Sequence, residues 1–170
     1  MLIPSDKVQQ IKNNKVCFVK DFISLKNNYD FNFISKILEE NNLNIINHTC
    51  YHNLKDVYQI VKISSVLKEF NILFDFFKKL FKYESHEKDE VDLFFSLVSQ
   101  VGPAHADFED VYIIGLEGKT MYKIYNDDND SYEINKGDLI FIPKGIKHKV
   151  IGITPRIIAS IGYYGGKING

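Results

Sequence analysis

The sequence predicts a mainly β fold, an antiparallel barrel or sandwich with helices before it, and three observations lead to this prediction. Short β-prone runs recur at hairpin spacing through the second half of the chain, separated by turns rich in Gly, Pro and Asn. The first half instead has apolar residues in three- and four-residue steps, which are typical of amphipathic helices. A length of 170 residues, 45% of them hydrophobic and 25% charged, fits one ordinary globular domain.

The N-terminal part, residues 1–90, is predicted to be mainly helical and to pack on the barrel. Residues 5–13 have the spacing of a short helix, with Ser5 as its N-cap. Residues 33–40 predict a second helix, and residues 16–19 form a short β-prone run between the two.

The longest helical pattern runs from Leu54 to Tyr83. Its apolar residues recur at helical spacing, so we expect one long helix or two helices joined near Asn71. The Phe-rich stretch 70–81 is expected to be core that covers the outside of the barrel.

Residues 43–51 alternate like a strand, and this alternation places three soft ligands, His48, Cys50 and His52, on one face. A structural zinc site normally has four protein ligands, and no fourth ligand is near in the sequence. An ordinary half-buried strand is therefore preferred to a second metal site.

The second part, residues 91–165, is predicted to form the barrel. Its β-prone runs are 91–101, 110–116, 119–125, 131–134, 138–142, 147–153 and 156–163. We find no internal repeat, and no linker rich enough in Pro, Gly or Ser to divide the chain, so residues 1–170 are predicted to be a single domain.

Composition and charge indicate which kinds of partner and which cellular compartment to expect. A formal net charge of -1 argues against a surface for nucleic acid or anionic membranes. Two cysteines cannot make a disulfide framework, and the N-terminus lacks the apolar core of a signal peptide. No stretch approaches the roughly 18 apolar residues of a membrane span. We therefore expect a cytoplasmic protein that acts on a small molecule or a protein, with a homodimer as the preferred assembly.

The chemistry-bearing residues begin with an H-x-D step. His105 and Asp107 follow a Gly-Pro turn, and residues two apart in an extended segment face the same way, so both side chains can point into a barrel. His148 comes later, beside the last strands. Two histidines and one carboxylate make the facial triad of non-haem Fe(II) oxygenases. Glu109 and Asp110 are close enough to offer alternative carboxylates.

The surroundings of these residues match a known pattern. Gly137, Pro143, Gly145 and His148 reproduce the second conserved motif of the cupin superfamily: glycine, five residues, proline, one residue, glycine, two residues, histidine. A glycine and an aspartate turn the hairpin before the strand, and the Pro-Lys-Gly bend after it lets His148 re-enter the barrel.

The first motif, residues 104–125, resembles the cupin oxygenases of the JmjC-like and ribosomal-oxygenase type. In those enzymes H-x-D is followed by an apolar strand and a Leu-Glu-Gly-Lys turn, as at residues 116–119 here. Classical cupins prefer two histidines plus a glutamate, whereas this chain has Asp107 in place of the second histidine. The resemblance covers residues 91–165.

This resemblance implies a double-stranded β-helix, or jelly-roll barrel, and a non-haem iron dioxygenase that uses Fe(II) and 2-oxoglutarate. Such an enzyme would be a hydroxylase of a protein side chain or a small molecule. His105, Asp107 and His148 would be its catalytic metal ligands. The residues expected to line the cavity are Tyr112, Tyr122, Phe141 and Ile142.

One position departs from these relatives. They usually hold the distal carboxylate of 2-oxoglutarate with a lysine just after the Gly-Lys turn, where this chain has Thr120, which can donate a hydrogen bond but carries no charge. Lys123 and Arg156 are the candidate replacements. Alternation turns Lys123 away from the face of Thr120, whereas Arg156, the only arginine, can hold a carboxylate through two parallel bonds. We predict Arg156 as the anchor, assisted by Thr120 or a tyrosine hydroxyl such as that of Tyr112.

The missing lysine leaves a second interpretation open. It favours a metal-binding cupin without oxygenase activity, either an isomerase-like enzyme or a small-ligand sensor.

Overall fold

The computed structural model describes residues 3–25, 28–40, 45–48, 60–64, 68–96, 100–126 and 128–167. Its helices are α1 (Ser5–Lys12), α2 (Phe31–Glu40) and α3 (Lys68–Phe81). Its strands are β1 (Cys17–Val19), β2 (Ile45–His48), β3 (Ile60–Ser64), β4 (Glu90–Ser96), β5 (Gln100–Val101), β6 (Asp110–Glu117), β7 (Thr120–Ile124), β8 (Ser131–Ile134), β9 (Leu139–Ile142), β10 (His148–Gly152) and β11 (Arg156–Tyr163).

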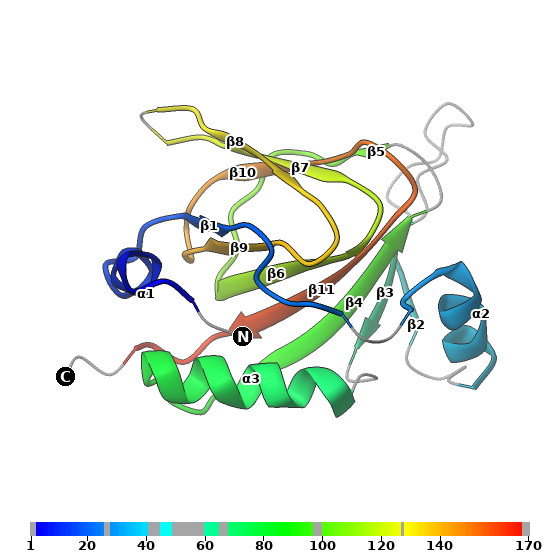
Figure 1. Cartoon of the computed structure of the whole chain (residues 1–170), viewed down its shortest axis with the longest axis horizontal. Helices are drawn as coiled ribbons and strands as arrows, with labels where there is room; N and C mark the ends of the chain where they lie inside the picture. Colours follow the sequence, from blue (N-terminus) through cyan, green and yellow to red (C-terminus); the bar gives the residue numbers. More distant parts are fainter. Residues whose placement is uncertain are drawn as a thin grey trace.

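The described strands form two antiparallel sheets that close into a jelly-roll barrel (Figure 1). The larger sheet has the order β1-β9-β6-β11-β4-β3-β2, and the smaller sheet has the order β5-β10-β7-β8. Every β-prone run predicted between residues 91 and 165 overlaps a strand, and the run at 91–101 overlaps both β4 and β5. The predicted fold, mainly β with N-terminal helices, is therefore confirmed.

Two apolar layers hold this arrangement together. The inner layer lies between the sheets and brings Val111 and Ile113 of β6 against Tyr122 and Ile124 of β7. The outer layer lies between the larger sheet and α3. Because both faces of β6 are covered, all of its residues except the last are buried, which explains its continuous apolar sequence.

Helix α3 covers the outer face of the larger sheet, as predicted for the Phe-rich stretch (Figure 1). The ring of Phe77 stacks on that of Tyr112 in β6, with 4.2 Å between centroids and 14° between planes. The ring of Phe74 stacks on that of Tyr163 in β11 at 4.9 Å. These contacts fix the back of the sheet whose other face looks into the barrel.

The structure corrects the long helix predicted from Leu54 to Tyr83. Residues 68–81 are helical, but residues 60–64 form strand β3, which pairs antiparallel with β4 on one side and β2 on the other. Ile60, Val61 and Ile63 are β-branched and favour a strand once a neighbouring strand is present. Pairing with β4 overrides the local helical spacing.

Two further predictions about the N-terminal part need correction. Helix α1 already includes Ser5, so Pro4 is its N-cap, and no side chain caps the helix. The larger sheet also extends beyond residues 91–165, because β1 pairs with β9 and β3 pairs with β4. The strand predicted at 16–19 is confirmed as β1 and the helix at 33–40 as part of α2.

Some predictions fall outside the described part of the chain. Of the three ligands predicted to share a face, Cys50 and His52 are among the residues that the structure does not describe. None of the described helices has the length and apolar character that crossing a membrane requires.

Candidate metal centre

His105 and His148 lie side by side although they come from different parts of the barrel. His148 is the first residue of β10, and His105 lies on the extended segment between β5 and β6. The backbone N–H of each donates to the carbonyl oxygen of the other, at 2.9 Å from His105 and 2.7 Å from His148. This pairing places the two imidazole centroids 4.4 Å apart.

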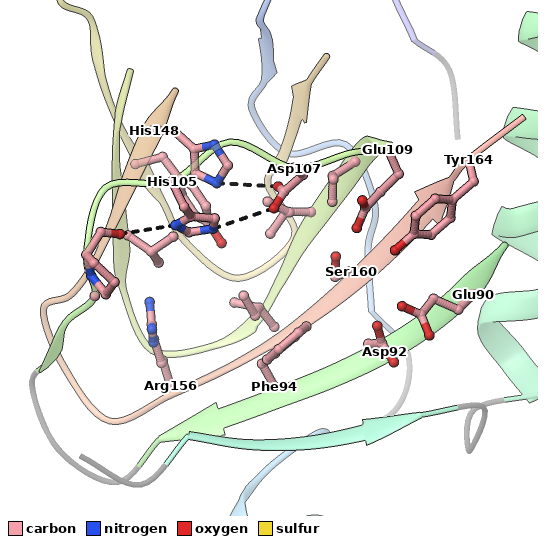
Figure 2. A pocket seen from close by; sticks show the side chains of 17 residues that line it. Glu90, Asp92, Phe94, His105, Asp107, Glu109, His148, Arg156, Ser160 and Tyr164 are labelled. Carbon is pink, nitrogen blue, oxygen red and sulfur yellow. Dashed lines mark hydrogen bonds and ion pairs between the residues drawn. The ribbon is translucent and has the colours of Figure 1, made fainter. Parts of the chain in front are cut away.

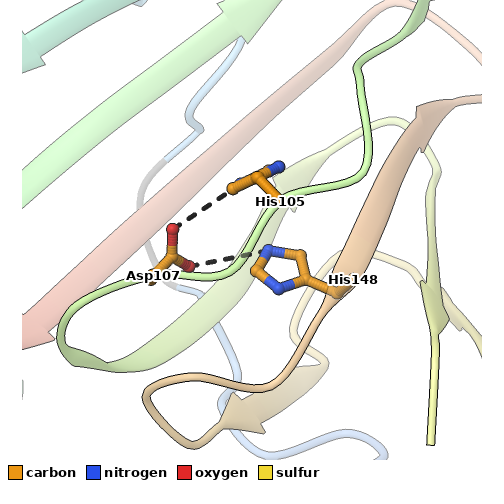
Figure 3. A group of neighbouring side chains, drawn as sticks. All are labelled: His105, Asp107 and His148. Carbon is orange, nitrogen blue, oxygen red and sulfur yellow. Dashed lines mark ion pairs between the residues drawn. The ribbon is translucent and has the colours of Figure 1, made fainter.

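Asp107 completes the group (Figure 3). Its carboxylate oxygens lie 3.6 Å from Nε2 of His105 and 3.6 Å from Nε2 of His148. One potential ligand atom from each residue lies within 4.8 Å of the other two. Atoms that each lie about 2.1 Å from one ion are roughly 3–4 Å apart, so the three side chains need only a small adjustment to share a metal.

Backbone carbonyls orient both imidazole rings. Nδ1 of His105 lies 3.1 Å from the carbonyl oxygen of Pro103, and Nδ1 of His148 lies 3.0 Å from that of Ile146. A carbonyl oxygen only accepts, so each Nδ1 is assigned the proton and each Nε2 keeps a free lone pair directed toward Asp107. This is the arrangement that metal-ligating histidines require.

Burial favours the ligand-competent form of His148. The side chain is only 2% exposed, and desolvation lowers the pKa of His148 below its ordinary value, while the Ile146 carbonyl and Asp107 act in the opposite direction. The neutral imidazole, which is the form that binds metals, is therefore favoured near neutral pH.

A tight turn brings His148 to this position. Ile146 N–H donates to the Pro143 carbonyl at 3.2 Å, and Gly145 has a φ of 79°, a left-handed conformation that favours glycine. Gly145 N–H also donates to the Asp107 carbonyl at 2.9 Å. The Pro-x-Gly pattern of the sequence motif thus corresponds to a turn, and a hydrogen bond joins this turn to the segment that carries His105 and Asp107.

The three side chains lie in the wall of a cavity of about 330 Å³ between the two sheets (Figure 2). Arg156, the first residue of β11, lines the same cavity and is 4% exposed. Its Nη1 has no hydrogen-bond partner among the described residues. Burial lowers the pKa of Arg156, although its environment beside Tyr122 partly opposes this change. A guanidinium stays charged in proteins, so the cavity holds a cation that an anionic ligand could pair with.

The remaining predicted cofactor residues are placed as follows. Tyr122 lines the cavity. Thr120 is buried on the same face of β7 as Tyr122, but it is not among the residues that line the cavity. Lys123 points to the other face, as alternation predicts, and its Nζ lies 5.4 Å from the centre of the Tyr125 ring. The structure therefore brings Arg156, and neither Thr120 nor Lys123, into the cavity of the triad.

The structure corrects the prediction that Tyr112 and Phe141 line the cavity. Val111 and Ile113 face the cavity from β6, so Tyr112 between them points to the outer layer. There its ring lies 4.7 Å from that of Phe141, and its hydroxyl lies 3.0 Å from that of Tyr83. Ile142 belongs to the inner layer but does not line the cavity either.

Of the polar residues at the other end of the cavity, the sequence pointed only to Glu109, as an alternative carboxylate. Glu90 and Asp92 of β4 and Glu109 line this end, together with Ser160 and Tyr164 (Figure 2). Burial, followed by the nearby charge of Asp107, raises the pKa of Glu109. Period-two alternation puts Glu90 and Asp92 on one face of β4, and this signal could have revealed them.

The two alternative carboxylates differ in position. Glu109 lines the cavity but lies outside the cluster of potential metal ligands found among the described residues. Asp110 is buried away from this cavity and bonds to Tyr83 and Lys167. Asp107 is therefore the carboxylate that shares a centre with the two histidines.

No family model and no curated protein sequence matches this chain. Solved structures of the ribosomal oxygenase YcfD from Escherichia coli are similar to it. One has a TM-score of 0.71 at 17% sequence identity, over 98% of this chain and 53% of that chain. Another, a complex with cobalt and 2-oxoglutarate, has a TM-score of 0.65 at 15% identity, over 98% of this chain and 53% of that one.

This chain spans about half the length of those solved structures. At such identities the similarity concerns the fold, which agrees with the one implied by the two sequence motifs. The chain thus has the cupin-type jelly-roll fold that these ribosomal-oxygenase structures share.

Proposed function

We propose that the protein is an Fe(II)- and 2-oxoglutarate-dependent oxygenase, a non-haem iron dioxygenase that hydroxylates a small molecule or a protein side chain. One observation carries the proposal. His105, Asp107 and His148 each offer one ligand atom within 4.8 Å of the other two, in the wall of a cavity that the buried Arg156 also lines.

The donor set fits a divalent metal. Two imidazole nitrogens and one carboxylate on one side of an ion are the ligands of non-haem Fe(II) oxygenases, and they leave positions open for other ligands. Bound Fe(II), together with 2-oxoglutarate and oxygen, would supply the oxidising power for attack on a C–H bond.

The protein's own groups would prepare the site for this chemistry. The Pro103 and Ile146 carbonyls hold the protons on Nδ1 of the two histidines, so that Nε2 stays available. Asp107 supplies a negative charge that offsets part of the charge of the metal. Apolar side chains such as Val111 and Ile113 limit the access of water to the wall behind the triad.

Arg156 would bind the distal carboxylate of 2-oxoglutarate. A carboxylate that becomes buried beside Arg156 needs a cationic partner, because leaving a buried charge unpaired costs several kcal/mol. Arg156 is the only lysine or arginine among the described residues that line the cavity. Its unpartnered Nη1 is a donor for this interaction, and a second guanidinium N–H would make it bidentate.

A second candidate function is metal binding without oxygenase chemistry, in an isomerase-like enzyme or a small-ligand sensor. It is favoured by Thr120, which stands where the related oxygenases have a lysine and does not line the cavity. In an oxygenase, Arg156 would take over the role of this lysine. In a metal-binding protein without oxygenase chemistry, no residue would need to.

Calorimetry with the Co(II)-loaded protein separates the two candidates. The oxygenase proposal expects 2-oxoglutarate to bind the Co(II)-loaded protein and to bind far more weakly when the metal has been removed. Succinate is the matched control, because it has two carboxylates but lacks the keto group that chelates the metal. Binding of Co(II) with no binding of 2-oxoglutarate would favour the second candidate.

A further inference from the structure

Asp110 is a buried carboxylate behind the metal centre. It is the first residue of β6, three residues after Asp107, and it is only 8% exposed. Its side chain does not line the cavity that holds the triad. A charge in such a position must be compensated by the protein itself.

One oxygen of Asp110 is held by groups from distant parts of the chain. The Tyr83 hydroxyl donates to Oδ2 at 2.7 Å, and Nζ of Lys167 lies 3.1 Å from the same oxygen. Lys167 is fixed in turn, because its Nζ donates to the Ile11 carbonyl at 2.9 Å and to Oδ1 of Asn14 at 2.7 Å. The carboxylate is therefore anchored to α1 and to the C-terminal segment.

The other oxygen reaches the turn that precedes His148. The backbone N–H of Lys144 donates to Oδ1 of Asp110 at 2.9 Å. The next residue, Gly145, donates its N–H to the Asp107 carbonyl, also at 2.9 Å. Two hydrogen bonds thus join the turn to residues 107–110, one between backbones and one through the Asp110 carboxylate.

We propose that Asp110 is a positioning residue for the metal centre, one that fixes the turn before His148 relative to the loop that carries Asp107. The inference rests on the proposed function to the extent that the triad holds a metal. Ligands of a metal site must be held within about 0.5 Å of their productive positions, so the supporting contacts affect metal affinity and coordination geometry. Asp110 provides such a supporting contact from outside the cavity.

The turn offers a precise test. With a positive φ at Gly145 and a bond from Ile146 N–H to Pro143, it has the features of a type II turn, which accepts proline at its second position. Lys144 holds that position, and its side chain is exposed. Lys144→Pro removes the N–H that donates to Asp110 and puts ring atoms in its place. Lys144→Ala is the matched control, because it keeps the N–H and removes only the side chain.

The probe is Co(II) alone. Titration gives its affinity, and the visible absorption bands of the bound ion report its coordination geometry. We expect Lys144→Pro to weaken Co(II) binding about tenfold, in the range typical of changes to outer-shell partners, and to shift the absorption bands. Lys144→Ala should match the wild type in both. Equal affinity and identical spectra for the two variants would overturn the proposal, whereas thermal unfolding of the metal-free proteins reports any general loss of stability.

A double-mutant cycle adds a second measurement. Asp110→Ala should weaken Co(II) binding to a similar degree, and adding Lys144→Pro to it should cause little further loss, because both changes break the same bond. Fully additive losses would contradict the proposal. Since the readout is metal binding, a protein that binds Co(II) but converts no 2-oxoglutarate would refute the proposed function and leave this inference standing; a wild type that binds no Co(II) would refute both.

Discussion

The backbones of His105 and His148 are hydrogen-bonded to each other in both directions. The carbonyl and N–H of each residue are used in the pair, so the main-chain separation of the two side chains is set without any ligand. The Nδ1 atoms are held by further carbonyls, which leaves little freedom for either ring. The arrangement is that of a preformed site.

Removing any one of the three ligands should remove the metal. His105→Ala, Asp107→Ala and His148→Ala should each weaken Co(II) binding by more than about a hundredfold, since loss of a ligand exceeds the 10–100-fold effect of changing an outer-shell partner. His86→Ala is the matched control, because His86 is exposed and lies outside the triad. Titration of the metal-free proteins measures the affinities, and tight binding by all three variants would place the metal elsewhere.

Arg156→Ala should weaken 2-oxoglutarate binding without affecting the metal. We expect the half-saturating concentration to rise at least about tenfold, equivalent to about 1.4 kcal/mol, because the distal carboxylate loses its cationic partner. Lys123→Ala is the control, since Lys123 lies on the other face of β7 and should behave as the wild type. An unchanged dependence on 2-oxoglutarate in Arg156→Ala would remove Arg156 from the site.

The strands of the barrel could be predicted because turn residues mark their ends. Strand β9, for example, lies between Gly137, which has a φ of 87°, and Pro143, which cannot continue the ladder. Strand β3 could not be predicted in this way. Its short apolar run also fits a helical period, and its partner β4 begins 26 residues after β3 ends, so only tertiary pairing decides its conformation.

The candidate site was predictable to a similar extent. The motif spacing identified His105, Asp107 and His148, which the structure brings together. The lining was harder to predict, because a one-residue error in the phase of a strand moves every side chain to the other face. In β6, for example, the phase puts Val111 and Ile113 in the cavity wall and turns Tyr112, which was expected there, to the outer layer. The network behind the site, from Asp110 to Lys167, joins residues too far apart in the chain for any local pattern to reveal.

Truncating the ring that joins α3 to the barrel should destabilise the protein. Phe77 is fully buried and stacks on Tyr112, so Phe77→Ala should reduce the free energy of unfolding by about 3–5 kcal/mol. Ile72→Ala on the same helix is the control, because Ile72 is 71% exposed, and the expected change is within about 0.5 kcal/mol. Chemical denaturation measures both, and equal losses would contradict the packing of α3 on β6.

Cys17 should react slowly in the folded protein. It is 1% exposed in β1, and burial raises the pKa of its thiol from 9.0 to about 11, so little thiolate is present at pH 8.5. In a Cys50→Ser background, where Cys17 is the only thiol, we expect modification by a thiol reagent to be at least about fiftyfold slower than in denaturant. Similar rates in the two conditions would argue that β1 does not pair with β9.

Formation of succinate from 2-oxoglutarate, measured with Fe(II) and oxygen present, tests the central claim most directly. We expect the wild type to release succinate, and His105→Ala, which lacks one metal ligand, to release none above the level without enzyme. Arg156→Ala should regain activity when 2-oxoglutarate is raised, which separates co-substrate binding from metal binding. The oxygenase assignment would be contradicted if the iron-loaded wild type released no succinate with any of a panel of candidate substrates and also did not bind 2-oxoglutarate.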